Sequence, residues 1–361
     1  MIPVAEPSLG KEELENVIKA IKSGWISSKG EFIEEFETKF AEYCGVKYGV
    51  ATSNGTVALH LALKALSIGK GDEVILPTLT FIATANAVSY CGAKHVFVDS
   101  HPYYWCIDPA KIEEKITENT KAIIPVHLYG HPCDMDWIMD IAEDRGLYLV
   151  EDAAEAHGAE YKGKKVGSFG DISCFSFYGN KIITTGEGGM CLTNDGELYK
   201  KMITLRDHGM SKERKYWHDV IGFNYRMTNI QAAIGSAQVE KLDVFVKKKR
   251  EIAEIYNSFL RDIKGITLPR EAKWAKNVYW MYSILVEDNF ALTRDELMVK
   301  LRENDADSRP FFYPVHVQPP YKRSEKMPVA EFLADRGINL PSAVTLKREN
   351  IEKIARIIKS V

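Results

Sequence analysis

Apolar residues along the chain follow two alternating patterns. Short apolar runs predict strands at 48–51, 73–76, 95–99, 122–126, 148–151, 172–177 and 189–193. Stretches with apolar residues every three or four positions, such as 135–143, separate many of these runs and predict helices. Strands that alternate with helices form βαβ units, so we expect a mostly parallel sheet covered by helices on both faces.

The two ends of the chain follow a different pattern. An amphipathic helix is predicted after Ser8, with Leu14, Val17, Ile18 and Ile21 at helical spacing, and a second helix follows Gly30. A long helical stretch covers 228–260, a strand is predicted at 281–286, and the last helix is expected to begin at Thr345 as its N-cap. We therefore expect an opening segment and large domain over 1–240 and a smaller α/β domain over 241–361.

A helix is predicted to begin at Asn54-Gly55-Thr56, directly after the first strand. A small, glycine-containing turn at a helix start exposes backbone N–H groups and the positive end of the helix dipole, which suits a phosphate. An ordinary helix N-cap has the same sequence, so this motif alone leaves both interpretations open.

Lys181 follows a strand with a buried pattern and precedes the glycine-rich run 186–189. A lysine among apolar and small residues at a strand end is a candidate for a lowered pKa and for bonding to an aldehyde. A surface lysine in a polar hairpin fits the same spacing.

Two adjacent acids, Glu151 and Asp152, end another apolar strand. Side chains at the carboxyl ends of parallel strands face the ligand crevice, and neighbouring residues of a strand point to opposite faces. One of the two carboxylates is therefore expected to enter the crevice, unless both cap the following helix.

The three motifs, at Asn54–Thr56, Lys181 and Glu151-Asp152, together fit the parts of one cofactor. A lysine for an aldehyde, a carboxylate for a ring nitrogen and a helix start for a phosphate are the groups that an enzyme using pyridoxal 5'-phosphate needs. Together they favour such an enzyme over the separate interpretations.

Composition excludes several other classes of protein. The 361 residues carry 47 Lys and Arg against 50 Asp and Glu, a net charge of −3, which argues against nucleic acid as the main partner. The uncharged stretch 74–93 contains too many polar residues for a membrane span. Six cysteines without a CxxC pair and no signal peptide predict a cytoplasmic protein with reduced thiols and no metal.

Motifs spread over the whole chain resemble the fold type I pyridoxal phosphate enzymes, specifically the DegT/DnrJ/EryC1/StrS family of sugar-nucleotide aminotransferases. The matching segments are 54–56, 77–78, 151–154, 175–177, 181–189 and 224–227. The resemblance implies the aspartate aminotransferase-like fold, with a large domain around a mostly parallel sheet and a smaller C-terminal α/β domain. It also implies a transaminase, because a branch that dehydrates its substrates carries histidine in place of Lys181.

The resemblance assigns roles to individual residues. Lys181 matches the lysine that bonds the cofactor aldehyde, Asp152 the acid paired with the pyridine nitrogen, and Glu155 a group near the ring hydroxyl where many relatives carry Gln. The remaining cofactor contacts that it implies are Gly55, Thr56 and Ser176 on the phosphate, Phe81 stacked on the ring, and Asn224 on the phosphate of the neighbouring subunit. The last contact implies a homodimer with shared active sites.

Substrate contacts follow from the same resemblance. The loop with Trp25, Ser27 and Ser28 and the segment with Arg309 and Tyr313 match regions that line the sugar or its phosphates. Core packing is the alternative for Trp25 and Tyr313.

The family resemblance implies L-glutamate as amino donor. Segments 25–30, 125–131 and 312–316 resemble those of family members that act on GDP-linked sugars, which implies GDP-4-dehydro-6-deoxymannose as acceptor, aminated at C4. Alternatives are a UDP- or dTDP-linked keto sugar, an eight-carbon keto sugar acid, a lyase or desulfurase on the same fold, and a non-catalytic cofactor-binding regulator. We assign no catalytic role to four histidines, His127, His131, His157 and His208.

Overall fold

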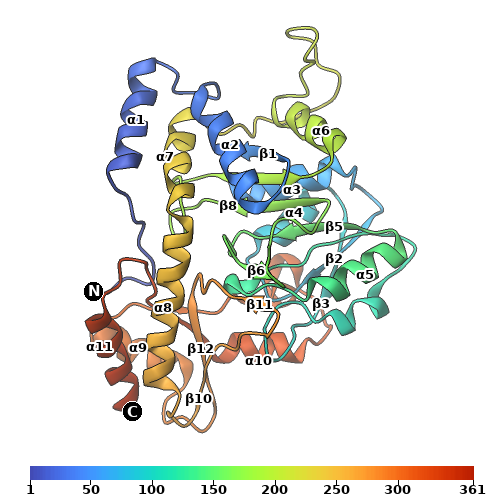
Figure 1. The fold of residues 1–361 in the computed structure, drawn as a ribbon. Coiled ribbons are helices and arrows are strands. Elements are labelled where there is room, and N and C mark those ends of the chain that lie inside the picture. The colour runs from blue at the N-terminus through green and yellow to red at the C-terminus, as the bar shows by residue number, and fades with distance from the viewer.

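A seven-stranded sheet forms the centre of the computed structural model, which describes residues 1–361 (Figure 1). Its strand order is β1-β9-β8-β5-β4-β2-β3. The strands are β1 (Tyr48–Thr52), β2 (Glu73–Pro77), β3 (Lys94–Val98), β4 (Thr120–Ile123), β5 (Tyr148–Asp152), β8 (Ile172–Ser176) and β9 (Gly189–Thr193). All neighbours are parallel except β9, which is antiparallel to both β1 and β8. The predicted mostly parallel sheet is confirmed.

β9 reverses direction because a short connection joins it to β8. Antiparallel strands need only a short link, whereas parallel strands need a crossover. Within the link, Phe177 N donates to Gly188 O over 2.8 Å and Thr185 N donates to Phe177 O over 2.9 Å. Lys181 lies in this link, so the hydrogen bonds of the hairpin determine where its side chain begins.

Helices cover the sheet (Figure 1). They are α1 (Lys11–Ser23), α2 (Glu31–Cys44), α3 (Gly55–Ala65), α4 (Ala83–Tyr90), α5 (Met135–Arg145), α6 (Gly196–Arg206) and α7 (Asn229–Glu240). α3 packs on β8 and β9, and α2 packs on β1 and α7. The apolar face of α2 carries Phe36 and Phe40, whose rings lie 4.9 and 5.1 Å from the ring of Phe177. This aromatic cluster supports the strand end next to Lys181.

The C-terminal part contains a second sheet with the order β10-β12-β14-β13. Its elements are α8 (Leu242–Leu260), β10 (Ile266–Thr267), β12 (Tyr282–Val286), α9 (Arg294–Glu303), β13 (Arg309–Pro310), α10 (Pro328–Arg336), β14 (Gly337–Leu340) and α11 (Arg348–Lys359). This part has its own hydrophobic core around Tyr256 and Tyr282. The helical stretch is interrupted at Lys241, and a domain boundary near 240 stays a prediction.

A third, small sheet links the two parts of the chain. It pairs β11 (Ala275–Lys276) with β6 (Glu160–Tyr161), which in turn pairs with β7 (Lys164–Lys165). The C-terminal segment that follows β11 and includes Trp280 is thereby held against the large domain.

Two local expectations differ from the structure. α11 begins after Lys347, and the Thr345 hydroxyl donates to Glu6 instead of capping the helix. The apolar spacing of Ile112 and Ile116 predicts a helix, yet the structure has two 3₁₀ turns there, Pro109–Lys111 and Glu113–Lys115. At Thr345 a partner distant in the sequence prevails over the local capping signal.

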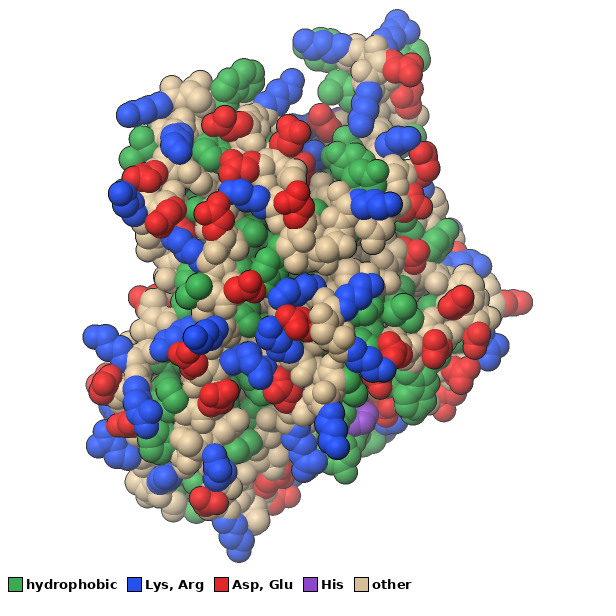
Figure 2. Space-filling model, in the orientation of Figure 1, with side chains coloured by type: hydrophobic (Ala, Val, Ile, Leu, Met, Phe, Trp, Pro, Cys, Tyr) green, Lys and Arg blue, Asp and Glu red, His purple; other side chains and the backbone are tan.

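The surface is charged but not of one sign. Figure 2 shows Lys, Arg, Asp and Glu side chains interspersed over the visible face. None of the helices combines the length and the apolar character that a membrane crossing requires.

Candidate active site

A cavity of about 730 Å³ lies at the carboxyl ends of the central strands, beside the N-terminus of α3. Asp152 ends β5, Ser176 ends β8, and Phe81 follows β2, so three neighbouring parts of the sheet deliver side chains to one place. This is the position at which parallel α/β sheets bind ligands. C-terminal residues, including Trp280 and Phe312, form the opposite wall.

The cavity brings together most of the side chains singled out from the sequence. The residues that line it are Gly55, Thr56, Phe81, Asp152, Glu155, Ser176, Lys181 and Arg309. The residues outside its lining are Trp25, Ser27, Ser28, Asn224 and Tyr313. Trp25 and Tyr313 are 56% and 59% exposed, so neither packs in the core of this chain.

The Lys181 amine is nearly buried in the cavity, with 10% of its side chain exposed. Its Nζ is 3.6 Å from the centre of the Trp280 ring and 3.9 Å from Glu155 Oε1. Burial lowers the pKa of the Lys181 amine, and the nearby Glu155 and Asp152 carboxylates offset only part of that effect. The site therefore raises the fraction of uncharged, nucleophilic amine at neutral pH.

The Asp152 carboxylate faces the same cavity and is held on both oxygens. Thr84 donates its hydroxyl to Oδ2 over 2.7 Å, and the backbone N–H of Ala154 donates to Oδ1 over 3.2 Å. Burial raises the pKa of Asp152, whereas the two donors act in the opposite direction. A cationic ring nitrogen beside this buried carboxylate would stabilise its charged form.

Glu151 and Asp152 point to opposite sides of β5, as the strand period requires. Glu151 is fully buried and accepts hydrogen bonds from backbone N–H groups of Gly167, Phe169 and Gly170 at 2.7 to 2.8 Å. The Glu151 carboxylate thus anchors the loop before β8, which leaves Asp152 as the acid of the crevice.

Glu155 also lines the cavity and lies on the loop that follows β5. Its Oε2 accepts the backbone N–H of Tyr129 over 2.8 Å, and burial raises its pKa. Because burial also lowers the pKa of Lys181, burial favours the neutral forms of both partners.

The N-terminus of α3 forms a tight cradle with the end of β8. Asn54 caps the helix by accepting Val57 N over 3.0 Å, which leaves the N–H groups of Gly55 and Thr56 directed at the cavity edge. A Cβ on Gly55 would lie 2.7 Å from Ser176 Cβ, so only glycine allows this approach. The Ser176 hydroxyl and the helix dipole together suit a phosphate.

Three residues of the site escaped the sequence analysis. Trp280 covers Lys181, Thr84 donates to Asp152, and Tyr129 turns its backbone N–H to Glu155 with a positive φ of 52°. Only the position of Thr84 in the segment after a strand gave a signal. None of the four histidines considered lines the cavity; His157, for example, packs among Phe40, Phe175 and Phe177.

The residues present fit pyridoxal phosphate. A buried amine, a buried carboxylate and a helix N-terminus with a glycine cradle surround one cavity, and Phe81 stands at its rim with 53% of its surface exposed. These groups match an aldehyde, a ring nitrogen, a phosphate and a flat ring, respectively.

Comparisons with known proteins agree with this geometry. The sequence pattern of the DegT/DnrJ/EryC1/StrS aminotransferase family matches residues 7–359. The chain is 53% identical to GDP-perosamine synthase of Escherichia coli O157:H7, with 97% of this chain and 95% of that protein covered. It is 48% identical to GDP-perosamine synthase of Caulobacter vibrioides, covering 100% and 98%.

A solved structure extends the agreement to the fold. DesV of S. venezuelae, solved in complex with a ketimine intermediate, superimposes with a TM-score of 0.92 at 36% identity, covering 97% of this chain and 94% of DesV. The match of the sequence pattern over nearly the whole chain and the similarity of the folds lead to one conclusion: the chain belongs to the DegT/DnrJ/EryC1/StrS aminotransferase family.

Proposed function

We propose that this protein transfers the amino group of L-glutamate to C4 of GDP-4-dehydro-6-deoxy-D-mannose, giving GDP-perosamine and 2-oxoglutarate with pyridoxal phosphate as cofactor. The buried Lys181 amine beside Asp152 is the observation that carries the reaction class. The sequence identity of 53% and 48% to two GDP-perosamine synthases over nearly the full chain supports the choice of acceptor.

Bound pyridoxal phosphate supplies an aldehyde that captures amines and a ring that accepts electron density. Lys181 Nζ would move one proton in each half-reaction: as a free amine it would take the proton from Cα of glutamate and pass it to the cofactor carbon that carries the amino nitrogen, and in the second half-reaction it would take a proton from that carbon and deliver it to C4 of the sugar. The lowered pKa of Lys181 suits this exchange, because the amine is available without a separate base.

The other cavity residues would hold and orient the cofactor. Asp152 places a negative charge where a protonated ring nitrogen is to be kept, and Thr84 keeps the carboxylate in that position. Ser176, Gly55 and Thr56 would bind the phosphate, Glu155 would accept a hydrogen bond from the ring hydroxyl, and Phe81 would cover one face of the ring.

We place the acceptor at the rim of the cavity, beside Arg309. A guanidinium there can bind the diphosphate by paired hydrogen bonds. Trp25, Ser27, Ser28 and Tyr313 lie outside the lining of the cavity and are proposed to contact the sugar nucleotide from its edge or from a second subunit.

We also infer that the active form is a homodimer with shared sites. Exposed apolar residues occur on α1 and its link to α2, namely Leu14, Ile18, Ile21, Trp25 and Ile26. A second set lies in the segment that projects between α6 and α7 (Figure 1), namely Tyr216, Trp217, Val220 and Ile221. Patches of this kind mark protein interfaces. Asn224 is exposed on the return of that segment, away from the cavity of its own chain, as a contact to a partner would require.

The same proposal places the protein in the cytoplasm, where its six unpaired cysteines would stay reduced.

An assay of purified protein with pyridoxal phosphate, L-glutamate and a panel of keto-sugar nucleotides tests the proposal. We expect 2-oxoglutarate and an aminated GDP-sugar, both detected by mass spectrometry, and no product from Lys181→Ala. Amination of a UDP- or dTDP-linked sugar alone, or of an eight-carbon keto sugar acid, would show that the proposed acceptor is wrong. Full activity of Lys181→Ala would contradict a transamination that depends on this lysine.

A further inference from the structure

His316 is a buried histidine in the C-terminal segment that follows β13. Its Nδ1 lies 2.6 Å from the Thr78 hydroxyl, and its Nε2 lies 3.3 Å from Glu331 Oε1. The Thr78 hydroxyl also accepts the backbone N–H of His316 over 3.3 Å. One tautomer satisfies every contact: the hydroxyl donates to Nδ1, and Nε2–H donates to the Glu331 carboxylate.

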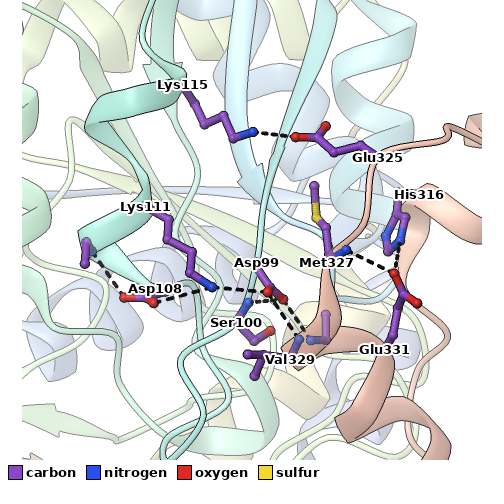
Figure 3. Close-up of polar contacts among 12 residues, drawn as sticks. Asp99, Ser100, Asp108, Lys111, Lys115, His316, Glu325, Met327, Val329 and Glu331 are labelled. Carbon is purple, nitrogen blue, oxygen red and sulfur yellow. Dashed lines mark hydrogen bonds and ion pairs between the residues drawn. The ribbon is translucent and has the colours of Figure 1, made fainter.

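One end of this chain of hydrogen bonds lies in the large domain and the other lies on α10 of the C-terminal part. Thr78 directly follows β2, and its carbonyl accepts Val315 N over 2.7 Å. Glu331 lies on α10, where it also accepts Met327 N over 3.0 Å (Figure 3).

α10 is in turn held at the end of β3. The buried Asp99 carboxylate accepts the N–H groups of Val329 and Ala330 at 3.2 and 2.8 Å, and Lys111 Nζ lies 3.2 Å from it (Figure 3). His316 therefore connects two supports on neighbouring strands of the sheet.

The segment just before His316 forms one wall of the cavity. Arg309 and Phe312 line it, and Phe312 N donates to the Tyr129 hydroxyl over 3.0 Å. The segment just after Thr78 forms the facing wall with Thr80 and Phe81. The rings of Phe81 and Phe312 are 5.6 Å apart, so the contact between Thr78 and His316 lies at the point where the two walls meet.

We propose that His316 is a positioning residue that sets the Arg309–Phe312 wall against the Phe81 wall and thereby determines how well the nucleotide-linked acceptor binds. The proposal rests on the proposed function only for the identity of the acceptor. His316 does not touch the cavity itself and acts through the backbone of the wall.

Hydrogen exchange of the holoenzyme tests the positioning without any acceptor. In His316→Leu, which loses both contacts, we expect the peptide covering 309–317 to exchange about 30-fold faster, since the two lost hydrogen bonds together cost about 2 kcal/mol and about 1.4 kcal/mol is a factor of ten. His316→Asn keeps an acceptor at the position of Nδ1 but loses the contact to Glu331, so it should restore part of the protection. Glu325→Gln, which breaks only the partly exposed pair with Lys115 nearby, is the matched control and should change nothing. Unchanged exchange in His316→Leu would overturn the proposal.

Single-turnover kinetics supply the second readout. We expect His316→Leu to raise the acceptor concentration for half-maximal rate about tenfold while the half-reaction with glutamate stays within about twofold, and His316→Asn, which keeps one of the two contacts, to lie between His316→Leu and wild type. Equal losses in both half-reactions, in step with a lower Tm, would show a merely structural role and overturn the proposal. Failure of the wild-type enzyme to aminate any nucleotide sugar would contradict the proposed function alone, because hydrogen exchange still decides the role of His316.

Discussion

The indole ring of Trp280 lies directly over the amine of Lys181, 3.6 Å from Nζ to the ring centre. Trp280 also donates its Nε1–H to Asn180 O over 2.8 Å, so the ring is held by the same link that carries the lysine. The ring stabilises the charged amine by a cation–π interaction and opposes the effect of burial.

Replacing Trp280 should therefore change the titration of Lys181. A cation–π contact of about 1 kcal/mol corresponds to roughly 0.7 pKa unit, so Trp280→Leu should lower the pKa of Lys181 further by about that amount. The pH dependence of pyridoxal phosphate capture by the apoprotein measures the shift. Trp280→Phe keeps an aromatic face and serves as control. An unchanged midpoint in Trp280→Leu would show that the ring has no electrostatic effect on the amine.

Asp152→Asn should retain the cofactor and lose most of the rate. A neutral amide has the shape of the carboxylate but cannot stabilise a cationic ring nitrogen, and losing such a group costs about 100-fold or more in turnover. Thr84→Val is the control, because it removes one hydrogen bond to Asp152 and keeps the charge, with an expected loss below about tenfold. Cofactor absorbance and steady-state turnover distinguish the two. Near-normal turnover of Asp152→Asn would show that Asp152 is not needed to stabilise the protonated ring nitrogen.

Gly55→Ala should weaken the binding of pyridoxal phosphate. The new methyl group would lie 2.7 Å from Ser176 Cβ and 3.2 Å from its Cα, so the helix start and the strand end must separate. We expect the Kd of the cofactor, measured by fluorescence titration, to rise about tenfold, because misplaced donors lose about one hydrogen bond to the phosphate. Gly69→Ala, whose methyl group would meet nothing closer than Cys91 O at 4.0 Å, should bind normally. Equal affinities of the two variants for the cofactor would show that the close approach of Gly55 to Ser176 does not contribute to phosphate binding.

Lys249 is a second buried lysine and predicts a pH-dependent stability. Its Nζ donates to Trp280 O over 2.7 Å and to the Ser342 carbonyl, without a carboxylate partner, and burial lowers its pKa from 10.5 to about 7. Between these values the unfolded chain binds more protons than the folded one. Relative to Lys249→Met, the wild type should therefore gain stability from pH 7 to about 10, by up to about 1.4 kcal/mol per pH unit.

Below pH 7 the folded and unfolded chains both carry the proton, so the difference between wild type and Lys249→Met should become constant. Urea unfolding of both proteins at several pH values measures it. Lys248→Met, a change at a partly exposed lysine on the same helix, should show no such slope. A flat difference across pH 7 to 10 for Lys249→Met would contradict a lowered pKa in the folded state.

Much of the fold followed from periodicity, because buried strands and the helices between them obey local rules. The strand 189–193 was predicted with the bounds that β9 has, and the helix start at Gly55 is where the structure has it. The meeting of Asp152, Ser176 and Gly55 follows from topology, since strand ends and helix starts gather at one edge of a parallel sheet.

The parts that could not be predicted depend on contacts between distant segments. No sequence signal marks Trp280, because only the docking of the C-terminal segment brings it over Lys181. Ile18 and Ile21 at helical spacing suggest a buried face, yet they are 41% and 57% exposed, because α1 buries Glu13 against Gln238 and Lys241 instead. Such pairings between distant segments leave no periodic trace in the sequence.

Shared active sites can be tested by mixing two inactive variants. Lys181 lines the cavity of its own chain, whereas Asn224 is proposed to serve the cavity of the partner. Lys181→Ala and Asn224→Ala should each retain little activity alone. In a mixed dimer one site lacks both residues and the other has both. Random assortment makes half of the dimers mixed, so roughly a quarter of wild-type activity should return after subunit exchange.

A second mixture controls for exchange without sharing. Lys181→Ala and Asp152→Asn alter residues of the same cavity, so every site of their mixed dimer keeps one defect and no activity should return. Native mass spectrometry of the exchanged subunits verifies that mixed dimers are present in both cases. Activity returning equally in both mixtures, or in neither although mixed dimers form, would show that Asn224 does not act across the interface.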